Sequence, residues 1–369
     1  MERISTHQLF TLMFIFEVGS TTLFALGIDA KQDAWIVILV SLLIGLVFIW
    51  IYTELQKEFP GRNYVEIIIA VLGKWVGIPL SLLYAVYWLY PAARNLREFG
   101  ELIVLTSLSN TPLSAVLFIF ILTSLFVLML GVEVLGRTSE ITMPVIAFFI
   151  VSLFIMIYIS GQVDFRNLTP ILSNGIKPVL KSAYPSVAIF PFGEIFIFSM
   201  YWCYADKKNA VRKATMAAAV SSGLLLSFTL AINVSVLGVE YTSSSTIPLI
   251  EVIKLVNIGD IITNIDAVGV VIIFLGGFYK MSLFLYGIVL VIATVFKIKN
   301  RSLLLVFISF FLLWVGIAFE PSYVFHKWLY PFDTNYFYIT FLHIIPALLL
   351  LIHWVRKKNS PSYLSNFLT

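Results

Sequence analysis

The side chains with the greatest chemical potential in this sequence are charged residues inside apolar stretches. Phe190-Pro191-Phe192-Gly193-Glu194 lies in an apolar run from about Tyr184 to Tyr204. Proline removes a backbone donor and crowds the preceding turn, and glycine weakens a helix further. We therefore expect a broken helix whose freed backbone groups line a cavity, because lipid cannot satisfy them. The alternative is a proline-kinked helix in which Glu194 faces the bundle and is purely structural.

A second break is expected in the first apolar run, where polar residues follow Glu17. Free N–H groups near this break would attract an anionic group such as a carboxylate. The carbonyl ends near Glu17 and Phe190 would suit a cation or an ammonium group. The two breaks together predict a ligand-binding set that comprises Glu17, Gly19, Ser20, Thr21, Thr22, Phe190, Phe192, Gly193 and Glu194.

Lys280 is the basic side chain deep in another apolar run, from about Ile262 to Phe296. We expect it to join Glu17 and Glu194 in a ligand or coupling site, since charges are expensive to keep inside a membrane. A buried ion network with only a structural role is the alternative, because buried charges need partners in any case.

A stripe of charged residues marks the run that begins near Val76. Arg94 and Glu98 are four residues apart, as are Arg97 and Glu101, so each pair shares one helix face. If the helix continues to about Leu105, these charges face a vestibule inside the bundle. If it ends earlier, they form a solvated extension. We assign Arg94 and Glu98, with Lys280, to a predicted charge network.

Composition excludes a soluble protein. The 369 residues are 60% hydrophobic and 12% charged. Apolar runs of roughly 20 residues predict an all-α integral membrane protein, because barrel strands would be about 10 residues long with alternating polarity. The net charge of +4 does not indicate nucleic acid binding. The scattered histidines and the lack of a phosphate-binding loop predict no enzyme, no catalytic residue, no metal site and no cofactor.

The apolar runs predict about ten transmembrane helices in a single polytopic domain of residues 1–358, followed by a short cytoplasmic tail of residues 359–369. A short amphipathic segment from Tyr64 to Lys74 is better placed in the interface. The expected spans run from about Leu9 to Ile28, Ala34 to Tyr52, Val76 to either Ala93 or Leu105, Pro112 to Val132, Ile141 to Ile159, Tyr184 to Tyr204, Ala214 to Leu237, Ile262 to Phe296, Leu303 to Phe319 and Tyr336 to Trp354.

Basic residues indicate the orientation of these spans. With the N-terminus in the cytoplasm, fifteen of the 24 Lys and Arg residues fall on the inner side and six on the outer side. This asymmetry follows the positive-inside rule. Ten spans then return the C-terminus to the cytoplasm as well.

The two interrupted spans are the first and the sixth, so they run in opposite directions. That pattern is typical of an inverted repeat of five plus five helices with the ligand site between its halves. We expect one repeat at about residues 5–160 and the second at about residues 182–358.

Several motifs carry a resemblance to a known family. They are Ile4-Ser5 with Gln8-Leu9-Phe10, Phe59-Pro60-Gly61, Leu168-Thr169-Pro170-Ile171 and the Phe190–Glu194 motif. With them, the chain resembles the B subunit of bacterial spore germinant receptors, a branch of the amino acid–polyamine–organocation transporter (APC) superfamily, nearly from end to end. The chain departs from the superfamily at Gly19-Ser20-Thr21, where Gly-x-Gly is frequent.

The resemblance implies a LeuT/APC-like fold with discontinuous helices 1 and 6. It also implies a multi-pass protein in the inner membrane of the spore that senses a small nutrient, an amino acid or a sugar. Partners implied are the receptor A subunit, the lipoprotein C subunit and membrane lipid. A proton- or cation-coupled amino acid permease is the alternative function, and an assembly protein with a vestigial site is a third. In the superfamily a sodium ion often ties helix 1 to helix 8, and we expect Lys280 to take that place; snorkelling to the inner headgroups is the alternative.

Overall fold

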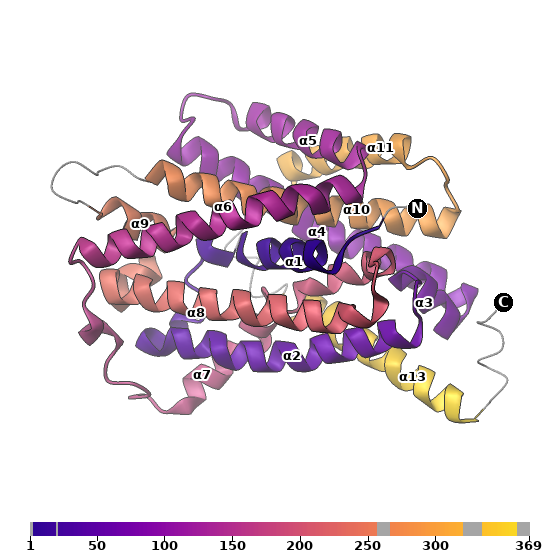
Figure 1. Cartoon of the computed structure of the whole chain (residues 1–369), viewed down its shortest axis with the longest axis horizontal. Coiled ribbons are helices and arrows are strands. Elements are labelled where there is room, and N and C mark those ends of the chain that lie inside the picture. Colours follow the sequence, from indigo (N-terminus) through magenta and orange to yellow (C-terminus); the bar gives the residue numbers. More distant parts are fainter. Residues whose placement is uncertain (1–2, 20, 257–265, 320–333, 360–369) are drawn as a thin grey trace.

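A computed structural model describes residues 3–19, 21–256, 266–319 and 334–359, and these are almost entirely helical (Figure 1). Seven helices in these ranges are long and apolar enough to cross a membrane, so the chain is a multi-pass membrane protein. The number of ten spans stays a prediction. Helices α1 (14 residues) and α5 (17 residues) are shorter than the seven long helices, and residues 184–204 do not form one continuous helix. Ser20, residues 262–265 of the expected eighth span and residues 360–369 of the expected tail lie outside the described residues.

Helix α1 (Thr6–Gly19) is the centre of the bundle (Figure 1). It packs against α6 (Val132–Ile159), α8 (Val211–Ser244) and α10 (Asp266–Phe296). Its first turn is closed by a reciprocal cap, in which Gln8 N donates to Ser5 Oγ at 3.0 Å and Ser5 N donates to Gln8 Oε1 at 2.9 Å. Almost every residue after the first turn is buried, so the helix has no face for lipid.

Two long helices flank this centre. Helix α2 (Ala34–Glu58) lies along α8, and helix α4 (Lys74–Thr106) lies along α10. The short helix expected from Tyr64 is present as α3 (Tyr64–Leu72), and its Asn63 side chain accepts from the Glu66 main chain. Helices α5 (Leu113–Met129) and α11 (Arg301–Ala318) cover α4 on one side. Helix α8 extends beyond the expected span and bends at Gly238, where φ is +72°.

The main chain changes conformation several times between residues 176 and 204. Helix α7 (Ile176–Ser182) passes into a π-helical turn, Ala183–Val187. Residues 190–193 then form turns, and a 3₁₀-helix, Glu194–Met200, follows. A regular helix is therefore interrupted at Phe190–Gly193, where the sequence places its proline and glycine.

A π-helical segment, Thr334–Ile344, leads into α13 (Ile345–Asn359). Pro346 has no N–H to offer to the preceding turn. Tyrosines donate to carbonyls of that turn instead: Tyr52 Oη donates to the Leu342 carbonyl, four residues before Pro346, at 2.7 Å, and Tyr84 Oη donates to the Phe341 carbonyl at 2.7 Å. These bonds connect the last helical segment to α2 and α4.

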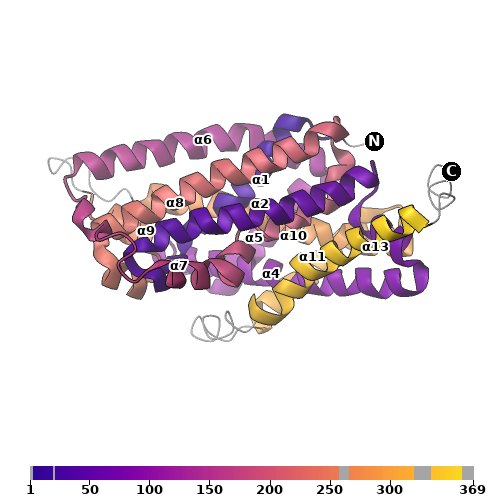
Figure 2. The same ribbon diagram turned by 90° about the horizontal axis from the view of Figure 1, so that it is seen from below.

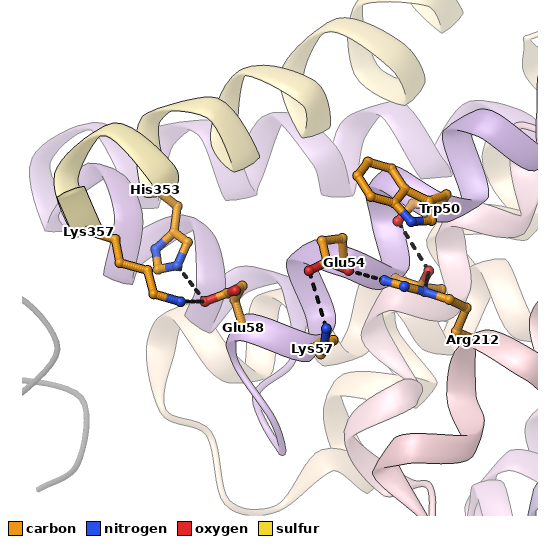
Figure 3. A network of polar contacts seen from close by, with 8 residues as sticks. Trp50, Glu54, Lys57, Glu58, Arg212, His353 and Lys357 are labelled. Carbon is orange, nitrogen blue, oxygen red and sulfur yellow. Dashed lines mark hydrogen bonds and ion pairs between the residues drawn. The ribbon is translucent and has the colours of Figure 1, made fainter.

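Helix α13 runs obliquely past one end of α2, as seen from below (Figure 2). There the Glu58 carboxylate contacts His353 Nε2 at 3.1 Å and Lys357 Nζ at 2.7 Å (Figure 3). One turn earlier on α2, Glu54 pairs with Arg212 of α8. Two acids of α2 thus bind both neighbouring helices at the same end of the bundle.

The start of the chain is fastened to the turn after the broken segment. Ile4 N donates to the Tyr204 carbonyl at 2.9 Å, and Asp206 N donates to the Ile4 carbonyl at 2.9 Å. Ile4 and Ala205 thereby form an isolated parallel β-bridge.

Candidate functional site

A buried ion pair lies at the second helix break. Lys280 Nζ of α10 is 2.6 Å from Glu194 Oε2, and their side chains are 0% and 4% exposed. Glu194 is the first residue of the 3₁₀-helix after the break, so the interrupted main chain positions it. Two charges this deep are tolerable only together, because a buried ion without a partner is strongly destabilising.

Two aromatic rings cover the lysine. Lys280 Nζ lies 4.4 Å from the ring centroid of Phe190 and 5.0 Å from that of Phe16. A cation over an aromatic face is attracted by the ring quadrupole, most strongly where water is excluded. Phe190 thus joins the predicted site through the ammonium group. Phe16 is a contact that the sequence did not reveal, although it directly precedes Glu17.

Glu17 joins the same cluster from α1. Its side chain is 0% exposed, and it is close enough to Lys280 and Glu194 to interact with both charges. Neither carboxylate oxygen has a hydrogen-bond partner among the described residues. We call Glu17, Glu194 and Lys280 the intramembrane cluster. The structure therefore brings together the three charges that the sequence singled out.

Glycines set the distance between α1 and α10 beside this cluster. A Cβ atom on Gly276 of α10 would lie 2.1 Å from the Cα atom of Gly19 of α1. On the neighbouring Gly277, a Cβ atom would lie 2.1 Å from the Phe99 ring of α4. The space beside Gly19 is thus filled by the main chain of α10. Gly193 is similarly enclosed, since a Cβ there would meet the Ile189 carbonyl oxygen at 2.9 Å. A ligand contact at either glycine stays a prediction.

The free N–H groups predicted at the first break would belong to an outer half-helix beginning near Ser20 to Thr22, but among the described residues after Gly19 the next α-helix begins only at Ala34. Residues Thr21–Leu23 form only a single 3₁₀ turn, too short for a helix N-terminus that attracts anions. The hydroxyl groups point backwards instead: Thr21 Oγ1 donates to the Glu17 carbonyl at 2.5 Å, and Thr22 Oγ1 to the Gly19 carbonyl at 3.5 Å. They help to satisfy carbonyls at the end of α1.

Thr21 and Thr22 also line a small cavity of about 10 Å³ against α8, room for about one water molecule. Asn233 of α8 shares this cavity, is 1% exposed, and leaves its Oδ1 atom without a partner among the described residues. Asn233 is a candidate residue that the sequence did not reveal, although it is an amide side chain in the expected span from Ala214 to Leu237.

Phe192 contacts helices α2 and α8, away from the charged groups of the site. It is 0% exposed and packs against Gly45 of α2 and Gly223 of α8, where added Cβ atoms would lie 2.6 and 3.1 Å from its side chain. These contacts give Phe192 a packing role between the two helices. A ligand contact for it stays a prediction.

The charged stripe lies on one continuous helix, because α4 runs to Thr106, and its members are buried or partly buried. Arg94 is 7% exposed and donates to Tyr90 Oη at 3.2 Å. Arg97 Nε donates to Glu101 Oε1 at 2.6 Å. The solvated alternative is therefore wrong for Arg94. Arg94 and Glu98 both act electrostatically on Glu194, which extends the intramembrane cluster towards α4.

Comparison with known proteins gives consistent matches. A family model described as spore germination protein matches residues 3–324. Spore germination protein KB of Bacillus subtilis (strain 168) is 33% identical over 365 residues, which cover 98% of this chain and 97% of that protein. Spore germination protein XB of Bacillus anthracis is 23% identical over 337 residues, which cover 89% of this chain and 90% of that protein.

Among solved structures, a nucleobase-cation-symport-1 family transporter, Mhp1, matches in a closed conformation with bromovinylhydantoin bound. The TM-score is 0.60 at 12% identity, and the match covers 88% of this chain and 74% of the transporter. An inward-facing conformation of Mhp1 matches with a TM-score of 0.50 over 97% of this chain and 92% of that one. At such identity the similarity concerns the fold alone, which is that of a transporter.

Proposed function

Because this chain belongs to the spore germination protein family, we propose that it is the membrane B subunit of a germinant receptor. In this proposal it binds a small nutrient, an amino acid or a sugar, in a transporter-like cavity and triggers germination. Family membership and the transporter fold support a receptor subunit of this kind. They also speak against an enzyme. Binding would shift the equilibrium between two conformations of the bundle, and a partner subunit would report the shift.

The observation that carries the proposal is the Lys280–Glu194 ion pair at the second helix break, next to Glu17 at the end of α1. Ionisable groups inside a membrane are retained mainly where they bind or relay something. Interrupted main chain beside them offers free backbone groups to a polar ligand. We propose the ligand site at this position, with Glu17, Thr21, Thr22, Phe190 and Glu194 nearest to the ligand.

We also propose the finer architecture that this function needs. It comprises about ten spans in two inverted repeats, with both termini in the cytoplasm and the protein in the inner membrane of the spore. Its partners would be the receptor A subunit and the lipoprotein C subunit. The transporter fold supports the repeat, since such folds place the site between two related halves.

A permease coupled to protons or cations is the second candidate function. The match to a solved symporter favours it. Uptake of labelled amino acids and sugars by the reconstituted protein, alone and with its partner subunits, separates the two. Accumulation inside vesicles by the protein alone would replace the receptor proposal with the permease.

The direct test of the site is Glu194→Gln in spores. We expect the variant to remain in the membrane and to need a much higher nutrient concentration for germination, because Lys280 loses its charged partner. Glu133→Gln is the matched control, since Glu133 pairs with Arg137 at the exposed start of α6. If Glu194→Gln spores respond at wild-type nutrient concentrations, the site is elsewhere.

A further inference from the structure

The intramembrane cluster does not balance its own charge. With every group ionised, Glu17 and Glu194 carry two negative charges and Lys280 carries one positive charge. The flanking pair on α4, Arg94 and Glu98, adds one charge of each sign and changes nothing. Among the residues that the structure describes, one negative charge is left over in this buried cluster. Such a charge must be neutralised, because an unpaired buried ion is far more costly than a neutral group.

Glu17 is the carboxylate of this cluster that is not in direct contact with the ammonium group in the structure. The ammonium group of Lys280 lies at 2.6 Å from Glu194, and the Thr21 hydroxyl is committed to the main-chain oxygen of Glu17. Both side-chain oxygens of Glu17 are buried and receive no hydrogen bond from the described residues. An ionised carboxylate normally accepts several hydrogen bonds, whereas a protonated one has less need of them.

We propose that Glu17 binds a proton in this conformation and thereby balances the intramembrane cluster. A metal cation would need several oxygen ligands around it, but the Glu17 main-chain carbonyl already accepts from Thr21. A proton needs no cavity, and Glu17 is 0% exposed. The inference goes beyond the proposed function, because it concerns the protein before any nutrient binds.

The protonation state of Glu17 decides which carboxylates can pair with Lys280. Lys280 contacts Glu194 while Glu17 is neutral, and release of the proton would make Glu17 a competing carboxylate for the same ammonium group. Within the described part of the chain, the charged groups that act on Glu17 are Lys280 of α10 and Glu194 of the broken segment, and Arg94 and Glu98 of α4 act on Glu194 in turn. The cluster thus has two pairings that differ by one proton.

Infrared spectroscopy of the purified full chain in detergent tests this without a nutrient, since a protonated carboxyl group has a carbonyl stretch that a carboxylate lacks. We expect one such buried band in the wild type. It should shift in Glu17→Asp and disappear in Glu17→Gln. It should stay in place in Glu194→Asp, and in Glu133→Gln as a surface control. Lys280→Met should add a second band, because removal of the positive charge leaves two acids to neutralise.

Three outcomes would overturn the proposal. The first is a wild-type spectrum with no protonated carboxyl band. The second is a band that shifts in Glu194→Asp and not in Glu17→Asp, which would place the proton on Glu194. The third is a band that disappears when sodium chloride replaces choline chloride at constant pH, which would show that a metal ion balances the cluster. None of these outcomes depends on which nutrient the protein senses.

Discussion

Gly19 and Gly276 touch through their main chains: a Cβ atom on Gly19 would lie 2.4 Å from the carbonyl carbon of Gly276. Lys280 is four residues after Gly276, hence one turn further along the same face of α10. The glycine contact therefore directs Lys280 at the last turn of α1, where Phe16 and Glu17 lie. Small residues allow this close approach between helices in a membrane.

Gly276→Ala should destabilise the protein by about 1–3 kcal/mol, because the added methyl group meets backbone that cannot move aside cheaply. Gly136→Ala in α6 is the matched control, since its Cβ would make an ordinary contact with Gln8 at 3.4 Å. Alanine there should be neutral or stabilising by up to about 1 kcal/mol through helix propensity. Thermal unfolding in detergent measures both. Equal stability of the two variants would contradict the main-chain contact.

Lys280→Met should cost up to about 3–5 kcal/mol of stability, because it leaves Glu194 buried without its ion-pair partner. The double variant Lys280→Met with Glu194→Gln should recover most of this loss, since it removes both charges. Lys280→Arg should keep the positive charge yet germinate poorly compared with the wild type, because the planar guanidinium group does not fit a space that holds a compact ammonium group. Stability and germination of each variant are the measurements.

The same lysine predicts that the nutrient response does not require sodium. In the superfamily that the chain resembles, a sodium ion often ties the first transmembrane helix to the eighth, and the ammonium group of Lys280 on α10 would take that place. Germination of wild-type spores should proceed equally in sodium and potassium buffers. A strict sodium requirement, or full activity in Lys280→Met, would refute this role.

Tyr52→Phe should cost about 1–3 kcal/mol, because the Leu342 carbonyl loses its donor inside the bundle. Pro346 removes the backbone N–H that would otherwise serve this turn. Pro346→Ala should therefore reduce the cost of Tyr52→Phe when the two are combined. If the double variant is no more stable than Tyr52→Phe alone, the proline is not the reason for the tyrosine contact.

Orientation is tested by cysteine labelling in a Cys203→Ser background. Asn209→Cys should be labelled only from the cytoplasmic side, and Lys177→Cys in α7 only from the outside. The positive-inside rule gives this expectation. Labelling of position 209 by a membrane-impermeant reagent in intact cells would reverse the topology.

Sequence alone gave the helical class and the position of the second break, because apolar runs and the Pro191–Gly193 pair are local signals. It also grouped Glu17, Glu194 and Lys280 in one site, since charges in a membrane must find partners, but it expected Lys280 to lie against the end of the first span near Glu17 and did not predict its pairing with Glu194. The structure joins these residues across 86 positions of sequence, from Glu194 to Lys280.

Other features depended on tertiary contacts that no local pattern encodes. Thr21–Leu23 forms a single 3₁₀ turn in place of an α-helix, and the Thr21 hydroxyl bonds back to the Glu17 carbonyl in α1. The packing of Phe192 between Gly45 and Gly223 requires knowledge of which helices are neighbours. The π-helical segment before Pro346 depends on tyrosines from α2 and α4.

The bridge between Ile4 and Ala205 has a mechanical consequence. Ile4 N donates to the Tyr204 carbonyl, and the Ile4 carbonyl accepts from Asp206 N. These bonds hold the residues before α1 against the residues that follow the broken segment. Any rearrangement that opens this end of the bundle must either break both main-chain bonds or carry the two termini of these segments together. The beginning of the helix that carries Glu17 and the end of the segment that carries Glu194 are thus tied to each other by main-chain bonds.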